Sequence, residues 1–264
     1  MRRFKVFAEF HPFLFVMILG FISVFLIILA YSWRELFQGS ELNQYVGQSV
    51  IQLASTLFLI FILWRFGWLR DSGFTSIGRG QAWIIIILLL IYVLAKDIYL
   101  MTGDFSFELS HPTLLFWLGL SSLITGLFEE TVFRGVVLFS FILLWGHSRS
   151  GMIKSISVTA LLFGGVHILQ LAENPVPQTV LTMLAAVLAG FFYGVILLHG
   201  RSIWIPIAFH GLHNAVVNLN MAGKNAGETP LISFFILVTY IPVFLLGIYL
   251  LNKIPQNEGK YQPL

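Results

Sequence analysis

The stretch GLFEETVFRG, residues 126–135, places Glu129, Glu130 and Arg134 near the middle of an apolar run that extends from about Pro112 to Trp145. A charge near the centre of a lipid bilayer costs at least a few kcal/mol, so chains retain one there when it is paired or used. Glu130 and Arg134 are four residues apart, which puts them on one helix face, where they can form an ion pair. Glu129 lies about 100° round the helix, and a carboxylate shielded from water is suited to act as a general base.

The whole chain has the composition of a membrane protein. Of its 264 residues, 58% are hydrophobic and only 10% are charged, and the mean hydropathy is +0.88. A soluble domain of this length needs more polar surface than this. We therefore predict an all-α, polytopic membrane protein with a bundle of about eight transmembrane helices. Apolar runs of membrane-spanning length place these helices near 13–31, 47–64, 81–101, 113–145, 153–171, 178–199, 203–221 and 231–252.

The distribution of Lys and Arg predicts the orientation of the bundle, because cytoplasmic loops carry the excess of basic residues. With the N-terminus inside, the outer loops hold only Arg34 and Lys224. The inner segments hold Arg2, Arg3, Lys5, Arg65, Arg70, Arg79, Arg149, Lys154, Arg201, Lys253 and Lys260. We expect both termini to be cytoplasmic and the membrane to be a prokaryotic plasma (inner) membrane. The basic residues are scattered and form no stripe, so no nucleic-acid partner is expected.

The fourth predicted span is too long for a simple crossing. Residues 113–145 would form a helix of about 50 Å, at 1.5 Å per residue. We expect this helix to tilt, to bend near Gly119 or Gly126, or to project beyond the membrane. In the later spans, small residues would allow neighbouring helices to approach closely; these are Gly164, Gly165, Gly190 and Gly194.

Polar side chains within the spans are few, and most of them fall in three spans. Besides the charged residues of the fourth span, they are His167, His210, His213, Asn214 and Asn218. A carboxylate and two imidazoles can activate water, either directly or through a Zn²⁺ ion held by Glu129, His167 and His210 with one position open. Asn214, four residues after His210, can donate a hydrogen bond to an oxyanion. This inventory favours hydrolysis of an amide or ester bond.

Other hydrolytic sites have no basis in the sequence. The chain has no cysteine, which excludes a thiolate nucleophile. The H-E-x-x-H zinc motif and the G-x-S-x-G nucleophile elbow are also missing. No cofactor fingerprint or phosphate-binding loop supports redox chemistry or phosphoryl transfer.

Two other functions would also account for charges inside a membrane. Glu, Arg and His mark ion pathways in transporters and proton-coupled carriers, although the sequence shows no inverted repeat of the transporter type. Alternatively, the polar cluster only fixes helix packing, as in a non-catalytic scaffold or immunity protein. Taken singly, each histidine is as readily explained by packing between helices.

Three motifs in order carry a resemblance to a known family. EETVFRG, from Glu129, resembles E-E-x-x-x-R; FGGVH, ending at His167, resembles F-x-x-x-H; and HGLHN, from His210, resembles H-x-x-x-N. They resemble the CPBP family of intramembrane proteases, which includes CAAX-processing endopeptidases of prenylated proteins and bacterial bacteriocin-immunity (Abi) relatives. The resemblance covers about residues 113–221, which we expect to be the catalytic core of a single membrane domain spanning residues 1–264.

The resemblance implies a role for each motif residue. Glu129 would activate the attacking water and His167 would assist it or bind a metal. His210 and Asn214 would line the oxyanion side, His210 with the option of metal ligation, while Glu130 and Arg134 would hold the geometry. The family has been described both as zinc-dependent and as metal-free, so the implied cofactor is zinc or none. The implied partners are the lipid bilayer and a peptide or protein substrate, either lipid-modified or membrane-embedded.

Overall fold

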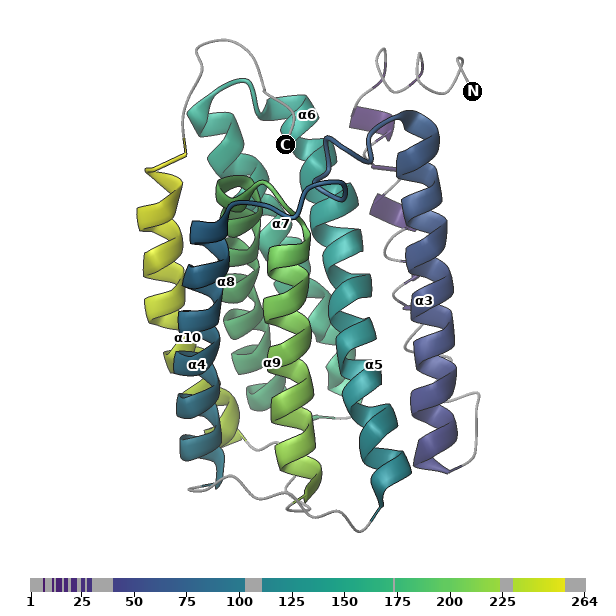
Figure 1. Ribbon diagram of the computed structural model, residues 1–264, viewed down its shortest axis with the longest axis vertical. Coiled ribbons are helices and arrows are strands. Elements are labelled where there is room, and N and C mark those ends of the chain that lie inside the picture. Colours follow the sequence, from purple (N-terminus) through teal and green to yellow (C-terminus); the bar gives the residue numbers. More distant parts are fainter. Residues whose placement is uncertain are drawn as a thin grey trace.

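A computed structural model describes residues 40–102, 111–172, 174–223 and 230–254, together with scattered positions between 7 and 29. Every regular element in the described ranges is helical, and the helices stand side by side as a bundle (Figure 1). The elements are α3 (Glu41–Phe66), α4 (Gly80–Thr102), α5 (Pro112–Glu130), η1 (Thr131–Leu138), α6 (Phe139–Trp145), α7 (Arg149–Val166), η2 (His167–Ala172), α8 (Val176–Gly200), α9 (Trp204–Gly223) and α10 (Pro230–Leu251). The predicted all-α class is confirmed.

The predicted spans correspond closely to these helices. The runs at 47–64, 81–101 and 178–199 lie within α3, α4 and α8. The run at 203–221 begins one residue before α9, and the run at 231–252 ends one residue after α10. The run at 153–171 corresponds to α7 followed by η2, a short 3₁₀ helix. In the first predicted span, 13–31, the described positions between 13 and 29 are helical, and the other positions lie outside the described residues.

The fourth predicted span is one continuous helical segment made of α5, η1 and α6. The α-helical hydrogen bonding continues through Gly119 and Gly126 and changes only at Thr131. From Thr131 to Leu138 the backbone is a π-helix, a wider helix that is rare and frequently found at functional sites. The irregularity therefore lies beyond both glycines, next to the charged residues.

Local sequence signals set several helix ends. The Ser40 and Ser148 hydroxyls accept hydrogen bonds from the backbone N–H groups of Asn43 and Gly151, which caps the starts of α3 and α7. Gly67 ends α3 in the left-handed conformation, with φ at 75°. Glycine adopts this conformation without the steric cost that a Cβ atom brings.

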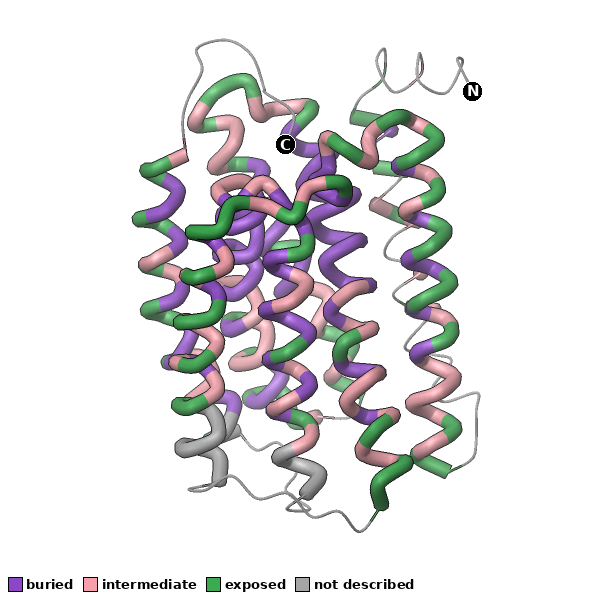
Figure 2. The backbone as a smooth tube through the Cα atoms, viewed as in Figure 1, coloured by how far each residue is buried: buried purple, intermediate pink, exposed green. Residues whose placement is uncertain are grey.

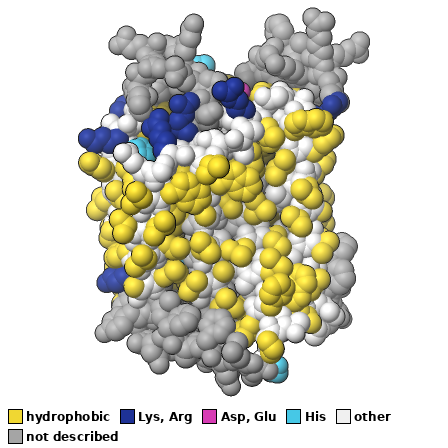
Figure 3. All heavy atoms as spheres, in the orientation of Figure 1, with side chains coloured by type: hydrophobic (Ala, Val, Ile, Leu, Met, Phe, Trp, Pro, Cys, Tyr) yellow, Lys and Arg dark blue, Asp and Glu magenta, His cyan; other side chains and the backbone are white. Residues whose placement is uncertain are grey.

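The outer surface is that of an integral membrane protein. Within the described residues, four helices are long and apolar enough to cross a membrane: Glu41–Phe66, Arg149–Ala172, Val176–Gly200 and Ser233–Leu251. Large apolar side chains such as Leu57, Ile87 and Leu245 are more than half exposed. Figure 3 shows a broad band of hydrophobic side chains on one face, with Lys and Arg gathered mainly near one end. Such a large exposed apolar surface fits contact with lipid.

The loops that the charge count assigned to one side lie together at one end of the bundle. The backbone N–H of Ile203 donates to the Gly73 carbonyl, and that of Arg79 donates to the Gly200 carbonyl at 2.9 Å. The Arg149 side chain donates to the Asn252 side chain and to the Leu251 carbonyl. We call this the basic end; it comprises residues 67–79, 146–148, 200–203 and 252–254. The other helix termini form the opposite end.

The best-buried part of the bundle lies in its interior toward the basic end (Figure 2). All eight residues of η1 are buried, and they pack with the second half of α8. Close helix contacts depend on Gly164, Gly190 and Gly194, where an added Cβ atom would lie 2.3, 2.9 and 3.1 Å from its nearest neighbour. The same expectation for Gly165 is wrong, because no atom lies within 4 Å of its Cβ position.

Candidate active site

The site begins where α5 and α9 touch through their backbones. A Cβ atom added to Gly126 would lie 2.6 Å from the Gly211 Cα atom, so no side chain fits between the two helices at this point. Gly126 is one helical turn before Glu130, and Gly211 follows His210 in the sequence. The close approach therefore brings Glu130 and His210 together, although they are 80 residues apart in the chain.

Glu130 is completely buried and contacts two helices. Its Oε2 atom lies 3.1 Å from Nε of Arg134, as the spacing of four residues predicted. Its Oε1 atom lies 2.9 Å from Nδ1 of His210. A carboxylate paired with arginine is ionised and can only accept hydrogen bonds, so Nδ1 of His210 carries the proton of this contact. In the neutral imidazole, Nε2 is then a proton acceptor.

Arg134 is held from several sides in the interior of the bundle. Its side chain is 0% exposed, and Nη2 donates to the backbone carbonyl of Gly190 at 3.0 Å. The guanidinium carbon lies 4.5 Å from the ring centroid of Phe163 and 5.0 Å from that of Tyr193, distances at which aromatic rings stabilise a cation. The ion pair with Glu130 lacks the angular alignment of a hydrogen bond. Arg134 is therefore positioned mainly by Gly190 and the two rings.

Glu129 faces a cavity instead of the buried ion pair. Its carboxylate Oε2 lies 3.9 Å from Nε2 of His210, the atom that the Glu130 contact leaves as a proton acceptor. This distance is too long for a direct hydrogen bond and short enough for one water molecule to contact both groups. The adjacent residues Glu129 and Glu130 thus contact opposite nitrogen atoms of one imidazole ring.

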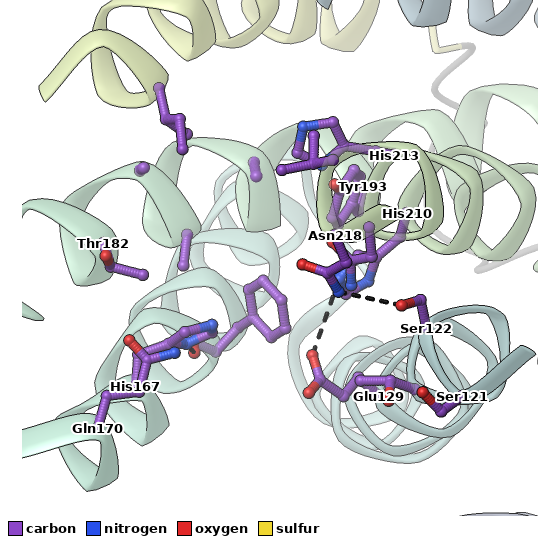
Figure 4. Close-up of a pocket in the computed structure, with 18 of the residues that line it drawn as sticks. Ser121, Ser122, Glu129, His167, Gln170, Thr182, Tyr193, His210, His213 and Asn218 are labelled. Atoms are coloured by element: carbon purple, nitrogen blue, oxygen red, sulfur yellow. Dashed lines mark hydrogen bonds and ion pairs between the residues drawn. The ribbon is translucent and has the colours of Figure 1, made fainter. Parts of the chain in front are cut away.

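The cavity has a volume of about 530 Å³ and is lined by residues of α3, α5, α7, η2, α8, α9 and α10. Figure 4 shows Glu129, His210 and Asn218 on one side of it, while His167 lies across the cavity beside Gln170. Nδ1 of His167 lies 2.9 Å from the Phe163 carbonyl oxygen. Because a carbonyl only accepts, this nitrogen is protonated. His167 thus lines the same cavity as Glu129, from the facing wall.

The polar residues of α9 take different positions around the cavity. Asn214 lines it next to His210, and its side chain makes no hydrogen bond to any of the described residues. Asn218 donates from Nδ2 to the Ser122 hydroxyl at 3.0 Å, which joins α9 to α5. His213 is buried, and its Nδ1 atom lies 3.2 Å from the Tyr240 hydroxyl of α10. The whole side-chain amide of Asn214 is therefore available to a substrate, whereas Asn218 and His213 each contact a neighbouring helix.

Other residues of the site were not found from the sequence. The ring of Tyr193 stacks on that of His210, with centroids 5.2 Å apart and planes 24° apart, and its hydroxyl hydrogen-bonds to Tyr240. Thr182 and Gln170 also line the cavity. Helices α3, α8 and α10 therefore also line the cavity, in addition to the three spans that carry the predicted site residues. A tyrosine in an apolar span gives no sequence signal. Gln170 could have been found, because it lies three residues after His167.

A zinc site does not fit this arrangement. Within the described part of the chain, no three His, Cys, Asp or Glu side chains lie close enough together to hold a metal ion. Glu129 and His210 are near each other, but His167 contacts its own helix from the facing wall. The predicted ligand set is therefore not gathered in this geometry.

Part of the chain matches a known protein family. Residues 111–216 match the family described as type II CAAX prenyl endopeptidase Rce1-like. No curated protein and no solved structure matches the chain. The matched segment holds all three sequence motifs, and the resemblance to the CPBP and CAAX proteases is confirmed. At the level of the family, the match supports a protease of the CAAX type embedded in the membrane.

Proposed function

From the match of residues 111–216 to this family of endopeptidases, we propose that the chain hydrolyses a peptide bond with a water molecule activated by Glu129. The observation that carries the proposal is the contact series Arg134, Glu130, His210 and Glu129. It runs from a buried ion pair to a carboxylate at the cavity surface. A charge buried at this depth is costly unless it has a use.

The attack begins with water held between Glu129 and Nε2 of His210. Glu129 accepts one proton from the water, and the water oxygen forms a bond to the carbonyl carbon of the peptide. His210 orients the water because Glu130 fixes the opposite side of its ring at 2.9 Å. When the carbon–nitrogen bond breaks, Glu129 returns the proton to the departing amine. The products are a carboxylic acid and an amine, which between them hold both protons of the water and ionise to a carboxylate and an ammonium group.

Asn214 and His167 supply the remaining groups. The Asn214 amide can donate to the oxyanion of the tetrahedral intermediate, since it lines the cavity one helical turn after His210. His167 has Nε2 available as a hydrogen-bond acceptor once Nδ1 donates to the Phe163 carbonyl. From the facing wall it can hold the substrate amide or assist the water. Glu130 and Arg134 support the site and do not take part in the bond changes.

Zinc is an alternative source of activated water in this proposal. Glu129, His167 and His210 are residue types that bind Zn²⁺, which would lower the pKa of a bound water. The described arrangement does not bring these three side chains together, so the steps above use no zinc ion. Metal analysis of the purified protein, together with activity after chelation, tests this version directly.

The location and extent of the active unit are also part of the proposal. We place the chain in a prokaryotic plasma (inner) membrane, with the basic end and both termini in the cytoplasm. Residues 113–221 form the catalytic core within one membrane domain spanning residues 1–264. Their boundaries follow the helices that carry Glu129, His167 and His210.

The test is a search for new peptide termini in membranes from cells that express wild type or Glu129→Gln at matched levels. Mass spectrometry should find termini that appear only with the wild type, and these identify the substrate. Equal profiles at good depth would contradict the proposal. Flux measurements in proteoliposomes would then examine the transporter alternative, and persistence of the biological phenotype in Glu129→Gln would favour the scaffold alternative.

A further inference from the structure

The cavity is closed toward the basic end of the bundle. Between the site and that end lie Phe192, Val195, Ile196, Ile203 and Phe209, all fully buried. The loop at residues 67–79 covers the same region. Two backbone hydrogen bonds join Gly73 to Ile203 and Arg79 to Gly200, and the Trp204 indole donates to the Phe74 carbonyl. Among the described residues, the region between the site and the basic end is therefore packed and hydrogen-bonded, which blocks a polypeptide from reaching Glu129 from that end.

The cavity extends instead toward the opposite end. Along α8 its lining runs from Tyr193 back to Thr182, and along α9 from His210 forward to Asn218. The two ends of the α8 stretch are eleven residues apart, or about 16 Å at 1.5 Å per residue. Tyr45 in the second turn of α3 and Gln170 in η2 line the cavity near this end. Glu129 and His210 thus lie at the inner limit of a cavity that leads away from the basic end.

The charges indicate which side of the membrane this is. Among the described residues, Arg65, Arg70, Arg79, Arg149, Lys154, Arg201 and Lys253 lie at or near the basic end, whereas Lys96 lies nearer the opposite end. Figure 3 shows this gathering on the face it displays. Short cytoplasmic loops carry the excess of Lys and Arg. The cavity therefore leads to the non-cytoplasmic side.

The lining also limits what binds there. The described residues that line the cavity include no Lys, Arg or Asp, and Glu129 at its inner limit is the one acid among them. Toward the opposite end the polar side chains are uncharged and include Tyr45, Gln48, Gln170 and Thr182. Such groups hydrogen-bond to a peptide backbone without selecting a charge.

We infer that the substrate is a polypeptide segment on the non-cytoplasmic side of the membrane, which enters the cavity from that side and binds through uncharged hydrogen-bonding groups. The substrate part of this inference rests on the proposed peptidase function; the direction of opening does not. A cytoplasmic protein terminus, prenylated or not, would meet the closed end of the bundle.

Thiol accessibility tests the direction of opening without any need for turnover. The natural chain has no cysteine, so in each single-cysteine variant the introduced thiol is the only one that can be labelled. Gln48→Cys and Gln170→Cys probe two walls of the cavity, and Ile77→Cys, at a residue 79% exposed in the loop of the basic end, is the matched control. The probe is a charged, membrane-impermeant thiol reagent, applied to intact cells and to inverted membrane vesicles.

In intact cells we expect the reagent to modify both cavity variants at least ten-fold faster than Ile77→Cys, and the order to reverse in inverted vesicles. Modification of Ile77→Cys in intact cells, with the cavity variants reached only after inversion, would overturn the inference. Cavity variants that react from neither side, yet react after unfolding, would also overturn it.

The cleavage sites test the substrate class. Termini that depend on Glu129 should map to non-cytoplasmic or membrane-embedded segments of proteins of known topology. If they map to cytoplasmic segments, the substrate inference is wrong even though the chain is a peptidase. If the labelling is as expected and no such termini appear, the proposed function and the substrate class fail while the direction of opening stands.

Discussion

Glu129 and Glu130 are neighbours in the chain but occupy different surroundings. Glu130 is 0% exposed and contacts Arg134 and His210, which are themselves held by other groups. Glu129 is 7% exposed and lines a cavity with Asn214, His167 and the facing nitrogen of His210. We refer to Glu130, Arg134 and Gly190 as the buried cluster, and to Glu129, Asn214 and His167 as the cavity group.

This contrast shows that two adjacent carboxylates in one helical turn have different roles: Glu130 belongs to a buried ion pair, and Glu129 faces the cavity. In the buried cluster, removal of one partner leaves an uncompensated charge inside the bundle, which is strongly destabilising. In the cavity group, the polar atoms meet water or substrate, so their removal changes chemistry more than folding. Variants of the two groups should therefore separate turnover from stability.

The largest expected effect on turnover comes from Glu129→Gln. The amide keeps the shape of the side chain but cannot accept the proton of the attacking water, so turnover should fall by about 10³-fold or more. The free energy of unfolding should change by no more than about 1 kcal/mol. Turnover of the substrate found by mass spectrometry and thermal unfolding in detergent measure the two quantities. Turnover within ten-fold of the wild type would remove Glu129 from its assigned role.

The largest expected effect on stability comes from Arg134→Met. It leaves the Glu130 carboxylate buried beside His210 without its cation, which should cost about 3–5 kcal/mol. The double variant Arg134→Met/Glu130→Gln has no buried charge at these positions and should recover part of that loss. A double variant less stable than Arg134→Met in thermal unfolding would show that the ion pair is not the source of the effect.

Asn214 and Asn218 form a matched pair on one face of α9. Asn214→Ala removes a donor available to the oxyanion, so turnover should fall by about 10²-fold or more with little change in stability. Asn218→Ala removes the hydrogen bond to Ser122, so it should lower the free energy of unfolding by about 1 kcal/mol. Its turnover should fall by less than ten-fold. If the two variants behave alike, the oxyanion role of Asn214 is wrong.

Gly126→Ala should have a smaller effect on stability than Arg134→Met. The added methyl group would lie 2.6 Å from the Gly211 Cα atom, so α5 and α9 must separate, at a cost of about 1–3 kcal/mol. The same movement lengthens the contact between Glu130 and His210, so turnover falls too. Gly165→Ala adds the same group where no atom lies within 4 Å, and it should alter neither quantity. Equal effects in the two variants would exclude helix separation as the cause.

The sequence predicted well whatever depends on residues close together in the chain. Hydropathy located the helices because a membrane span requires a long apolar run. The pair of Glu130 and Arg134 followed from a spacing of four residues, and the structure confirms it. The order of the three motifs identified the family that matches residues 111–216.

What the sequence could not predict depends on contacts between helices. The approach of Gly126 to Gly211 joins distant segments, and nothing in the sequence marked Gly126 as a contact point instead of a bend. The stacking of Tyr193 on His210 was missed for the same reason, because an aromatic residue in an apolar span has many neighbours to choose from. The gathering of Glu129, His167 and His210 around zinc stays a prediction that this geometry does not support.

The π-helix at Thr131–Leu138 lets a single membrane crossing change its packing partners halfway along. Before it, α5 packs against α3 and α9; after it, α6 packs against α7. In a soluble protein such a change of neighbours is usually made by a loop, but an irregular backbone exposed to lipid leaves polar groups without partners. A wider helix turns the side chains toward new neighbours while its backbone stays hydrogen-bonded. One membrane crossing thereby packs against α3 and α9 in its first part and against α7 in its last part. Its charged residues lie where the packing partners change.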